Sequence, residues 1–517
     1  SGQSNSGNNI PPLRSEISLS HSPGYYIHNF LLKLHGDSNV EIRYTTNSTK
    51  PSPSTKLYVN KAIEIGSLAD KPDQFTIIPS STPARWREPA KRSDKMTIVR
   101  ARPFVNGIPV GEEICGSFWI GHHNPENNKL PIVSLVTCPE NLFDYEEGIY
   151  VPGIFYDETG EENFMQRGRE WERDVFFSFF DTSGIEQISQ HAGLRIQGGW
   201  TRKYRQKSLR LYARNSYGNE YFEHPFFEHS ENSSFKRLQL TSTMKDDYTQ
   251  TLLKDELATV LVRNLDQDYL EFTPVIVFIN GEYWGIHFLK ERRDRYWLAD
   301  NHDVNPENIE WLAWHMFIKH GSDNHYRDMI GFIESANPET IYTYDYIKQK
   351  MDVENYIDYM CLEIYLHNHD WPHNNIEYWR PATIDGKWRW IYFDFDRAIE
   401  QWQEDNLSHY FNNNDDFKKF FLLRNLMKIP EFKRDFITRM YFHMQNTVRP
   451  DIICNEIEKL KRKLEPHVPN HIARWQFPTS LYEWYEKLGL LQSFAMLRPA
   501  EIFKIMNDLQ LEPHLVY

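Results

Sequence analysis

Cysteine, long apolar runs and net positive charge are all scarce in this chain. No apolar run approaches the roughly 18 residues that cross a membrane, and the mean hydropathy is −0.64. The cysteines stand far apart without any C-x-x-C pair, at Cys115, Cys138, Cys361 and Cys454. Their spacing excludes a cysteine-built zinc site and a disulfide scaffold, and it leaves the redox compartment open.

The net charge and the length of the chain restrict the kinds of partner and the number of domains to expect. A formal net charge of −14 disfavours nonspecific binding to nucleic acid. A basic peptide or a small nucleotide fits the charge better as a partner. With 517 residues, 40% hydrophobic and 15% aromatic, the chain can bury large cores. We expect two or three domains, at about 150 residues each.

The first 14 residues read as a flexible leader, because SGQSNSGNN is a Gly/Ser/Asn tract. The sequence begins at Ser1. A polar leader of this kind is expected behind a cleaved export or lipoprotein signal, and a cloning remnant would look the same. An exported protein of the cell surface, envelope or extracellular space is therefore the expected localisation.

Residues 15–122 show short β-like runs with turn chemistry between them, including a hairpin signal at Asn106-Gly107. These features predict a small all-β sandwich. The phrases SPGYYIHNFLLKL, IRYTTNSTKPSPST and IVRARPFVNGIPVGE also resemble the immunoglobulin-like module at the C-terminus of chitobiases and β-hexosaminidases. Asn47-Ser48 stands where that pattern usually has Asp-Gly. The resemblance implies a spacer or adhesive role without catalysis.

Residues 367–398 hold the strongest chemical signal. Asp370 is followed by Asn375 at the spacing D-x-x-x-x-N, and Asp394-Phe395-Asp396 comes after the apolar run 391–393. Asp385-Gly386 marks a hairpin between the two motifs. Phosphoryl transfer needs a carboxylate that orients the attacking hydroxyl and oxygen ligands for divalent cations. Protein kinases place these groups as D-x-x-x-x-N and then Asp-Phe-Gly, so the order and spacing favour kinase-like chemistry.

The same motif leaves other functions open. Two carboxylates at one strand end repel each other unless a cation or base holds them. Phosphatases with an aspartyl nucleophile and metal-dependent glycosyltransferases also carry D-x-D. The phosphatase plan needs a doubly wound βα series after the motif, whereas residues 415–517 read as amphipathic helices, for example at 417–427 and 499–509. His367, His369 and His373 invite a transition-metal site, although such histidines more often serve as hydrogen-bonding supports.

A glycine turn precedes the motif by more than 150 residues. Gly198 and Gly199 follow the apolar run 194–196, and a predicted strand at 208–212 follows Lys207. Glycine turns let backbone amides approach phosphate oxygens, and a lysine on the next strand can reach the same phosphates. Basic residues crowd this turn in an otherwise acidic protein, at Arg202, Lys203, Arg205, Lys207 and Arg210. A solvated hairpin would look similar.

These passages together resemble the spore coat protein H (CotH) kinase family. The motifs are RIQGGWTRKYRQKSLRLYAR, YGNEYFEHPFF, VFINGEYWGIHFLKER, DWPHNN, DGKWRWIYFDFDRA and FAMLRPAEI, in the family's order. The family is similar to atypical secreted kinases that use ATP and a divalent metal, Mg²⁺ or Mn²⁺, to phosphorylate serines of other proteins. The resemblance implies roles for Lys207 at the phosphates, Asp370 in catalysis, and Asn375, Asp394 or Asp396 in the metal site. Many members have Arg-Gly-x-Ser where this chain has Gln197–Thr201.

The segments between the motifs fit a two-lobed plan. A helix predicted at 249–264 could supply Asp255 or Glu256 to pair with Lys207, as the αC glutamate does in kinases. Strands predicted at 272–278 and 283–289 are joined by Asn280-Gly281, and their exit at Lys290-Glu291-Arg292 would be the hinge near the adenine. Asp352 is expected to cap the helix that delivers Asp370. Arg498, in the "FAxxRP" motif, is expected to form a buried salt bridge.

The sequence therefore predicts an α+β protein: an immunoglobulin-like sandwich at 15–122, then a bilobal, atypical kinase-like domain at 130–517. The expected activity is transfer of the γ-phosphoryl group of ATP to Ser/Thr hydroxyls of a cell-surface protein, with a basic, Ser-rich protein as the expected substrate. The catalytic candidates are Asp370 and Lys207. The candidates for cofactor and metal binding are Gly198, Gly199, Arg202, Lys207, Glu291, Asn375, Asp394 and Asp396. The alternatives are a noncatalytic envelope scaffold and a metal-dependent transferase or phosphatase.

Overall fold

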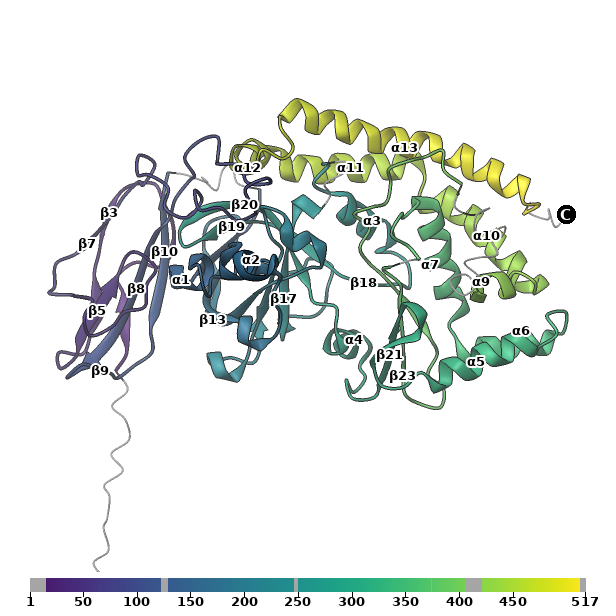
Figure 1. The fold of residues 1–517 in the computed structure, drawn as a ribbon, viewed down its shortest axis with the longest axis horizontal. Coiled ribbons are helices and arrows are strands. Elements are labelled where there is room, and N and C mark those ends of the chain that lie inside the picture. Colours follow the sequence, from purple (N-terminus) through teal and green to yellow (C-terminus); the bar gives the residue numbers. More distant parts are fainter. Residues whose placement is uncertain are drawn as a thin grey trace, which may run out of the picture.

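The computed structural model describes residues 15–121, 129–245, 250–372, 374–405, 407 and 421–511. The molecule is elongated (Figure 1). Small sheets of the N-terminal part lie at one end, a β-barrel occupies the middle, and a second sheet with most of the helices forms the other end. The fold is mixed α+β, as the sequence predicts.

The N-terminal part contains three small sheets. The largest has the strand order β2-β10-β8-β5-β6, with β9 paired to β8, and the other two are the pairs β1-β4 and β3-β7. The predicted hairpin at Asn106-Gly107 joins β8 and β9. The immunoglobulin-like assignment and the domain boundaries stay predictions. The strands are β1 (Ile17–Leu19), β2 (Gly24–Tyr26), β3 (Phe30–Leu32), β4 (Leu34–Gly36), β5 (Glu41–Thr45), β6 (Lys56–Leu57), β7 (Ile63–Ile65), β8 (Thr97–Val105), β9 (Ile108–Pro109) and β10 (Ile114–Ile120).

A buried glutamate fastens this part to the barrel. The Glu282 carboxylate accepts hydrogen bonds from the backbone N–H groups of Gln74, Phe75 and Thr76, at 2.6, 3.0 and 2.8 Å. The Met96 N–H donates to the Gly281 carbonyl at 2.7 Å. Charge-assisted bonds to a buried carboxylate are stronger than neutral ones. The N-terminal sheets are therefore attached to the barrel through the hairpin that carries Glu282.

Seven strands close the barrel in the order β11-β12-β13-β14-β17-β20-β19. Closure comes from β11 and β19, which pair in parallel, while the other neighbours are antiparallel. Asn280 and Gly281 have φ of 50° and 84°, as a tight hairpin turn requires. This confirms the predicted hairpin between β19 and β20. The strands are β11 (Ile132–Val136), β12 (Arg173–Phe180), β13 (Glu186–Ile196), β14 (Leu209–Tyr212), β17 (Arg237–Ser242), β19 (Phe272–Ile279) and β20 (Glu282–Glu291).

A second sheet of five strands follows the barrel, in the order β18-β24-β23-β21-β22. Asp385-Gly386 lies in the turn between β23 and β24, as predicted. Helix α7 (Val353–Leu366) packs beside this sheet, and Glu354 alone among its residues is not buried. The Asp352 carboxylate caps α7 by accepting from the Asn355 N–H at 3.1 Å, which confirms the predicted cap. The strands are β18 (Asp268–Tyr269), β21 (Ile309–Ala313), β22 (Phe317–His320), β23 (Glu377–Pro381) and β24 (Arg389–Tyr392).

The three helices predicted at 249–264, 417–427 and 499–509 have other bounds in the structure. Helix α3 (Lys254–Val262) is shorter than the predicted 249–264. The helix predicted at 417–427 appears as α9 (Phe421–Leu426), and its first residues lie outside the described part. Helices α10 (Pro430–Asn446), α11 (Pro450–Leu464) and α12 (Val468–Trp475) precede the long α13 (Leu481–Asp508), which packs on α11 (Figure 1). The helix predicted at 499–509 is the end of α13.

Arg498 lies within α13 and is fully buried. Its guanidinium donates to the carbonyl oxygens of Ile364, Tyr365, Trp402 and Glu404. The expected salt bridge is therefore replaced, among the partners that the structure describes, by backbone carbonyls. Among the described residues, no helix is both long enough and apolar enough to cross a membrane.

Candidate functional site

A polar cleft of about 380 Å³ lies where the barrel meets the second sheet. The glycine turn and β17 line one part of it, and the end of β20, α3 and the segments that follow α7 and β24 line the other. The lysine, arginine and aspartate residues in its lining are Lys245, Asp255, Lys290, Arg292, Arg293, Asp370, Asp394 and Asp396. A larger hollow of about 1260 Å³ is lined by residues of the N-terminal part and by Asn280, Gly281 and Glu282 of the barrel hairpin. None of the predicted site residues lines that hollow, so the smaller cleft is the candidate site.

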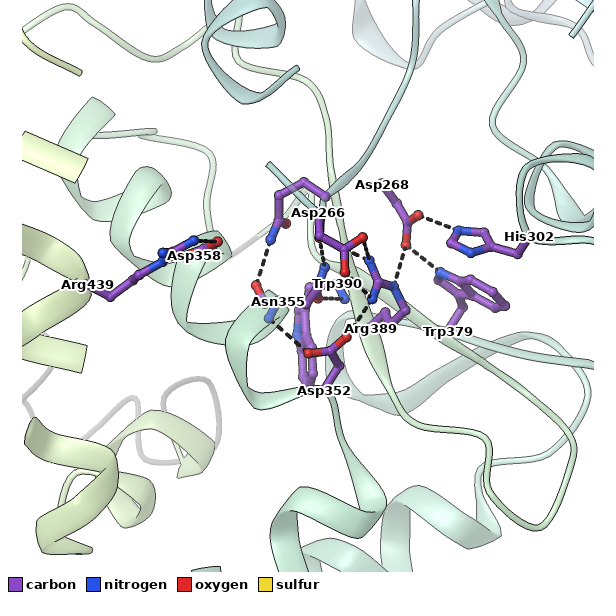
Figure 2. Close-up of polar contacts among 11 residues, drawn as sticks. Asp266, Asp268, His302, Asp352, Asn355, Asp358, Trp379, Arg389, Trp390 and Arg439 are labelled. Atoms are coloured by element: carbon purple, nitrogen blue, oxygen red, sulfur yellow. Dashed lines mark hydrogen bonds and ion pairs between the residues drawn. The ribbon is translucent and has the colours of Figure 1, made fainter. Parts of the chain in front are cut away.

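A network around Arg389 fixes the two segments that carry the acidic residues (Figure 2). The Arg389 guanidinium bonds Asp352 at the start of α7 and Asp266 before β18, at 2.5 and 2.8 Å. The Asn355 side chain accepts from the Trp390 N–H at 2.7 Å. Helix α7 is thereby locked to β24, and the loops that leave their far ends deliver Asp370 and Asp394-Phe395-Asp396 to one place.

Three of the predicted acidic residues line the cleft together. Asp394 has φ of 65°, and its side chain is 42% exposed. Asp396 is buried, and burial together with the Asp394 charge raises the pKa of its carboxyl well above the ordinary value. Burial also raises the pKa of Asp370, although Arg397 partly offsets this. The geometry therefore brings the D-x-D pair and the loop aspartate to the same cavity.

A second group of charges lies beside them. The Asp255 carboxylate on α3 bonds Lys245 at 2.7 Å and Lys290 at 2.6 Å, and it accepts from the Phe395 N–H at 2.7 Å. Lys290 also pairs with Glu256 at 2.7 Å. Burial opposes the charged forms, yet the two lysines hold the pKa of Asp255 below its ordinary value. The predicted acid on this helix is thus present, but its partners are Lys290 and Lys245, and the predicted pairing with Lys207 is wrong.

The glycine turn is only partly as predicted. Gly198 and Gly199 line the cleft, and Gly198 has φ of 110°. Lys207 is fully buried outside the cleft lining, where its Nζ donates to the Arg202 and Tyr204 carbonyls at 2.7 and 3.0 Å. Arg202 also turns inward, and its guanidinium donates to four backbone carbonyls, those of Phe164, Gln166, Ile196 and Gly198. This geometry does not support the predicted phosphate contacts of Lys207 and Arg202.

Two further candidates lie outside the lining of the cleft. Glu291 ends β20 in a buried position, where its carboxylate accepts from the Glu271 N–H at 2.9 Å and from the Trp297 indole at 3.2 Å. Burial raises the pKa of Glu291 to about 7. Asn375 is half-buried, and its neighbour Asn374 lines the cleft instead. The geometry therefore does not support the predicted cofactor contact of Glu291, and it offers Asn374 in place of Asn375. His373 lies outside the described residues.

Sequence reasoning named Lys290 and Arg292 only as hinge residues, and it missed Lys245 and Arg293, although all four cations line the cleft. Lys290 follows the apolar residues of β20. A lysine in a buried strand needs an acidic partner, so this sequence context could have pointed to Lys290 as a paired cation. Arg293 lies with its guanidinium carbon 3.2 Å from the centre of the Phe393 ring, and it bonds Glu377 at 3.0 Å. Lys245 follows β17 and carries no motif of its own. Its role becomes visible only when the fold sets it beside Asp255.

The donor set suits a hard divalent cation. Asp394 and Asp396 offer oxygen ligands, which Mg²⁺ and Mn²⁺ prefer. The raised pKa of the Asp396 carboxyl reflects a buried acid next to a second carboxylate, and a bound cation would relieve that repulsion. The residues present therefore fit the metal that kinase chemistry requires.

The comparisons with known proteins agree with this chemistry. A protein-family model described as CotH kinase protein matches residues 194–502, which is more than half of the chain. A search of curated proteins finds no match. The matched segment includes the glycine turn, α3, β20, Asp370 and the D-x-D pair. The chain belongs to the CotH kinase family.

Proposed function

We propose that this chain is an atypical protein kinase that transfers the γ-phosphoryl group of ATP to a Ser/Thr hydroxyl of another protein. The convergence of Asp370, Asp394 and Asp396 with Lys245 and Lys290 on one cleft carries the proposal. In this proposal the barrel acts as the nucleotide-binding lobe, and α7 with the second sheet acts as the lobe that supplies the acids. Export from the cell is carried over from the polar leader and the family resemblance, a basic substrate from the net charge of −14, and serine as the acceptor from the family resemblance.

Each wall of the cleft has a part in this chemistry. Asp394 and Asp396 are the residues that would hold the divalent cation. Lys245 and Lys290 both line the cleft and are the candidates for contacts with phosphate oxygens. Neighbouring carboxylates raise the pKa of each lysine despite burial and so keep both charged. Mg-ATP, when bound, supplies the transferable phosphoryl group and the cation that neutralises charge on the phosphate oxygens.

Asp370 is the candidate for orienting the acceptor hydroxyl. Its carboxylate is half-buried at the cleft, and burial raises its pKa, which makes it a better proton acceptor than an exposed aspartate. The Asn374 N–H donates to the Asp370 carbonyl at 2.7 Å and tightens this loop. Asp370 would therefore hold the hydroxyl in line and take up its proton as the new oxygen–phosphorus bond forms and the bond from the γ-phosphorus to the leaving ADP oxygen breaks.

Calorimetry of Mg-ATP and Mn-ATP binding tests the nucleotide site. We expect metal-dependent binding by the wild type and its loss in the double variant Asp394→Ala/Asp396→Ala. Asp328→Ala, an exposed acid on α5 (Asn324–Ser335), removes a carboxylate away from the cleft and serves as the matched control. Phosphate transfer from labelled ATP to a Ser-rich basic protein then tests the reaction.

Each outcome has a clear meaning. Binding that the double variant loses and Asp328→Ala keeps would support the kinase proposal. A well-folded wild type that binds no Mg-ATP would favour the noncatalytic scaffold. Turnover of a sugar nucleotide or a phosphomonoester without ATP would favour a transferase or phosphatase that uses Asp394 and Asp396.

A further inference from the structure

Two histidines and one glutamate meet next to the cleft without lining it. His367 and His369 flank the turn at the end of α7, and Glu404 comes from the segment that follows the D-x-D pair. One ligand atom from each side chain lies within 4.8 Å of the other two. The His367 Nε2 atom is 3.2 Å from the Glu404 Oε2 atom, and the two imidazole rings lie 4.4 Å apart at 77°. These three residues, from two separate segments, are called the His-His-Glu cluster below.

Backbone hydrogen bonds hold the two segments together at this point. The His369 N–H donates to the Arg397 carbonyl at 3.2 Å, and the Ile399 N–H donates to the Leu366 carbonyl at 2.8 Å. Arg498 adds a second tie, because it donates to the Tyr365 carbonyl at 2.9 Å and to the Glu404 carbonyl at 2.7 Å. Main-chain hydrogen bonds therefore hold the two segments of the cluster in place, independently of contacts among the three side chains.

The imidazoles have nitrogen atoms with unused bonding capacity. The buried Nε2 of His369 has no hydrogen-bond partner among the described residues. His367 is 4% exposed, and its Nε2, the nitrogen beside Glu404, is the atom that would bind an ion. A buried polar atom without a partner costs free energy and calls for an explanation such as an ion or a water. The neutral imidazole is the form that binds metal ions.

The spacing also suits a small cation. In a tetrahedral site with bonds of about 2.0–2.1 Å, neighbouring ligand atoms lie about 3.3 Å apart. The 3.2 Å between His367 Nε2 and Glu404 Oε2 matches this spacing. The Glu404 side chain is 47% exposed and can adjust its position, and it brings the negative charge that balances part of the cation's charge. The charge of Arg498 faces backbone carbonyl oxygens, which lessen its effect on the site.

We propose that the His-His-Glu cluster binds a divalent transition-metal ion, with Zn²⁺ as the best match. Two imidazoles and one carboxylate are the ligands of many zinc sites, whereas the Mg-ATP cleft offers carboxylate oxygens. The fourth position is left to water. The ion would tie the loop that carries Asp370 to the segment after the D-x-D pair, as a positioning site distinct from the nucleotide cleft.

The test needs no nucleotide and no activity. The full chain is freed of metal with a chelator and titrated with Zn²⁺ by calorimetry, and Co²⁺ is then used as a probe whose visible spectrum reports tetrahedral nitrogen and oxygen ligands. We expect one ion per chain. His369→Ala and Glu404→Gln should each weaken Zn²⁺ binding at least tenfold and abolish the Co²⁺ spectrum. His229→Ala, an exposed histidine elsewhere, should change neither.

Further variants keep the result independent of folding and of the kinase proposal. Glu404→Gln changes a partly exposed side chain, so its fold is expected to survive even if His369→Ala lowers the melting temperature. Asp394→Ala/Asp396→Ala should leave Zn²⁺ binding intact. A folded wild type that takes up no Zn²⁺, or uptake that Glu404→Gln and His369→Ala leave unchanged, would overturn the proposal.

Discussion

The cations near the two walls of the cleft have different partners: carboxylates on one wall and backbone carbonyls on the other. On the acid wall, formed by α3, β20 and the D-x-D pair, Lys290 faces the carboxylates of Asp255 and Glu256. The glycine wall is formed by residues 197–201. The Arg202 and Lys207 side chains that follow it turn away from the cleft and donate to backbone carbonyls. A cation next to a glycine turn in the sequence need not point into the site. What decides its direction is the partner that the fold provides.

The partner of each buried lysine also decides whether its ammonium group stays charged. Burying an ammonium group costs several kcal/mol unless an anion or strong hydrogen bonds compensate. Against burial, two carboxylates raise the pKa of Lys290, whereas burial lowers the pKa of Lys207 well below its ordinary value. Lys290 is therefore positively charged at neutral pH and suited to bind phosphate, and Lys207 serves the packing of the turn. The following changes test this difference between the walls, from the largest expected effect to the smallest.

Asp370→Asn should have the largest effect, on the chemical step alone. We expect kcat for phosphoryl transfer to fall by about 10²–10⁴-fold, the usual contribution of a general base. Mg-ATP affinity should change little, because the metal ligands remain. Burial raises the pKa of Asp370, so the wild-type rate should rise with pH as this carboxyl loses its proton. Rate measurements across pH check both points, and an Asn variant with full activity would contradict them.

Lys290→Met should remove the ion pairs that Lys290 makes with Asp255 and Glu256 on the acid wall. The change leaves the buried carboxylates of Asp255 and Glu256 with less positive charge, which costs about 3–5 kcal/mol of folding free energy. Mg-ATP affinity should fall at least tenfold. Urea unfolding and calorimetry measure the two effects separately.

A double variant separates the two causes. Lys290→Met with Glu256→Gln should recover part of the stability, because one unpaired carboxylate is removed, but it should not recover nucleotide binding. If Lys290→Met binds Mg-ATP as the wild type does, Lys290 has no phosphate role, and the contrast between the walls loses its functional meaning.

Glu291→Gln tests a neighbour of Lys290 that points to the other face of β20, as successive residues of a strand do. Burial raises the pKa of Glu291 from 4.5 to about 7, so the folded state binds this proton more tightly than the unfolded state. Its contribution is full below pH 4.5 and is lost as pH rises through 7, by about 3 kcal/mol. The Gln variant should lack this loss, and its nucleotide affinity should be unchanged. Parallel stability curves between pH 4.5 and 8 would contradict the assignment.

Local patterns predicted the elements that depend on neighbours in the sequence. Asn280-Gly281 predicted the β19–β20 hairpin, and Asp352 predicted the start of α7, because turn and cap preferences act over a few residues. The D-x-D motif and Asp370 were found for the same reason. These features pointed to Asp370, Asp394 and Asp396, which line one cleft, without any knowledge of the tertiary fold.

Long-range pairing could not be predicted in this way. The parallel pairing of β11 with β19 closes the barrel across more than 130 residues, and it has no local signature. The pairing of Asp255 with Lys245 and Lys290, and the approach of Glu404 to His367, depend on the same closure and packing. The predicted helix at 499–509 begins at Pro499, yet α13 continues through this residue, since packing on α11 overrides a local preference.

Lys207→Met should have the smallest effect on function, and it completes the contrast with Lys290. Methionine fills a similar apolar volume beside Phe164, whose ring centre lies 3.5 Å from the Lys207 Nζ atom. The Arg202 and Tyr204 carbonyls lose their donor, which costs about 1–3 kcal/mol. Because burial lowers the folded-state pKa of Lys207, the wild type should gain stability as pH rises toward the ordinary lysine value, and the variant should not. Mg-ATP affinity should stay within about threefold of the wild type, since nothing on the cleft surface is removed. A folded Lys207→Met protein that loses nucleotide binding tenfold would return this lysine to the phosphate site, and it would show that the glycine wall rearranges when nucleotide enters.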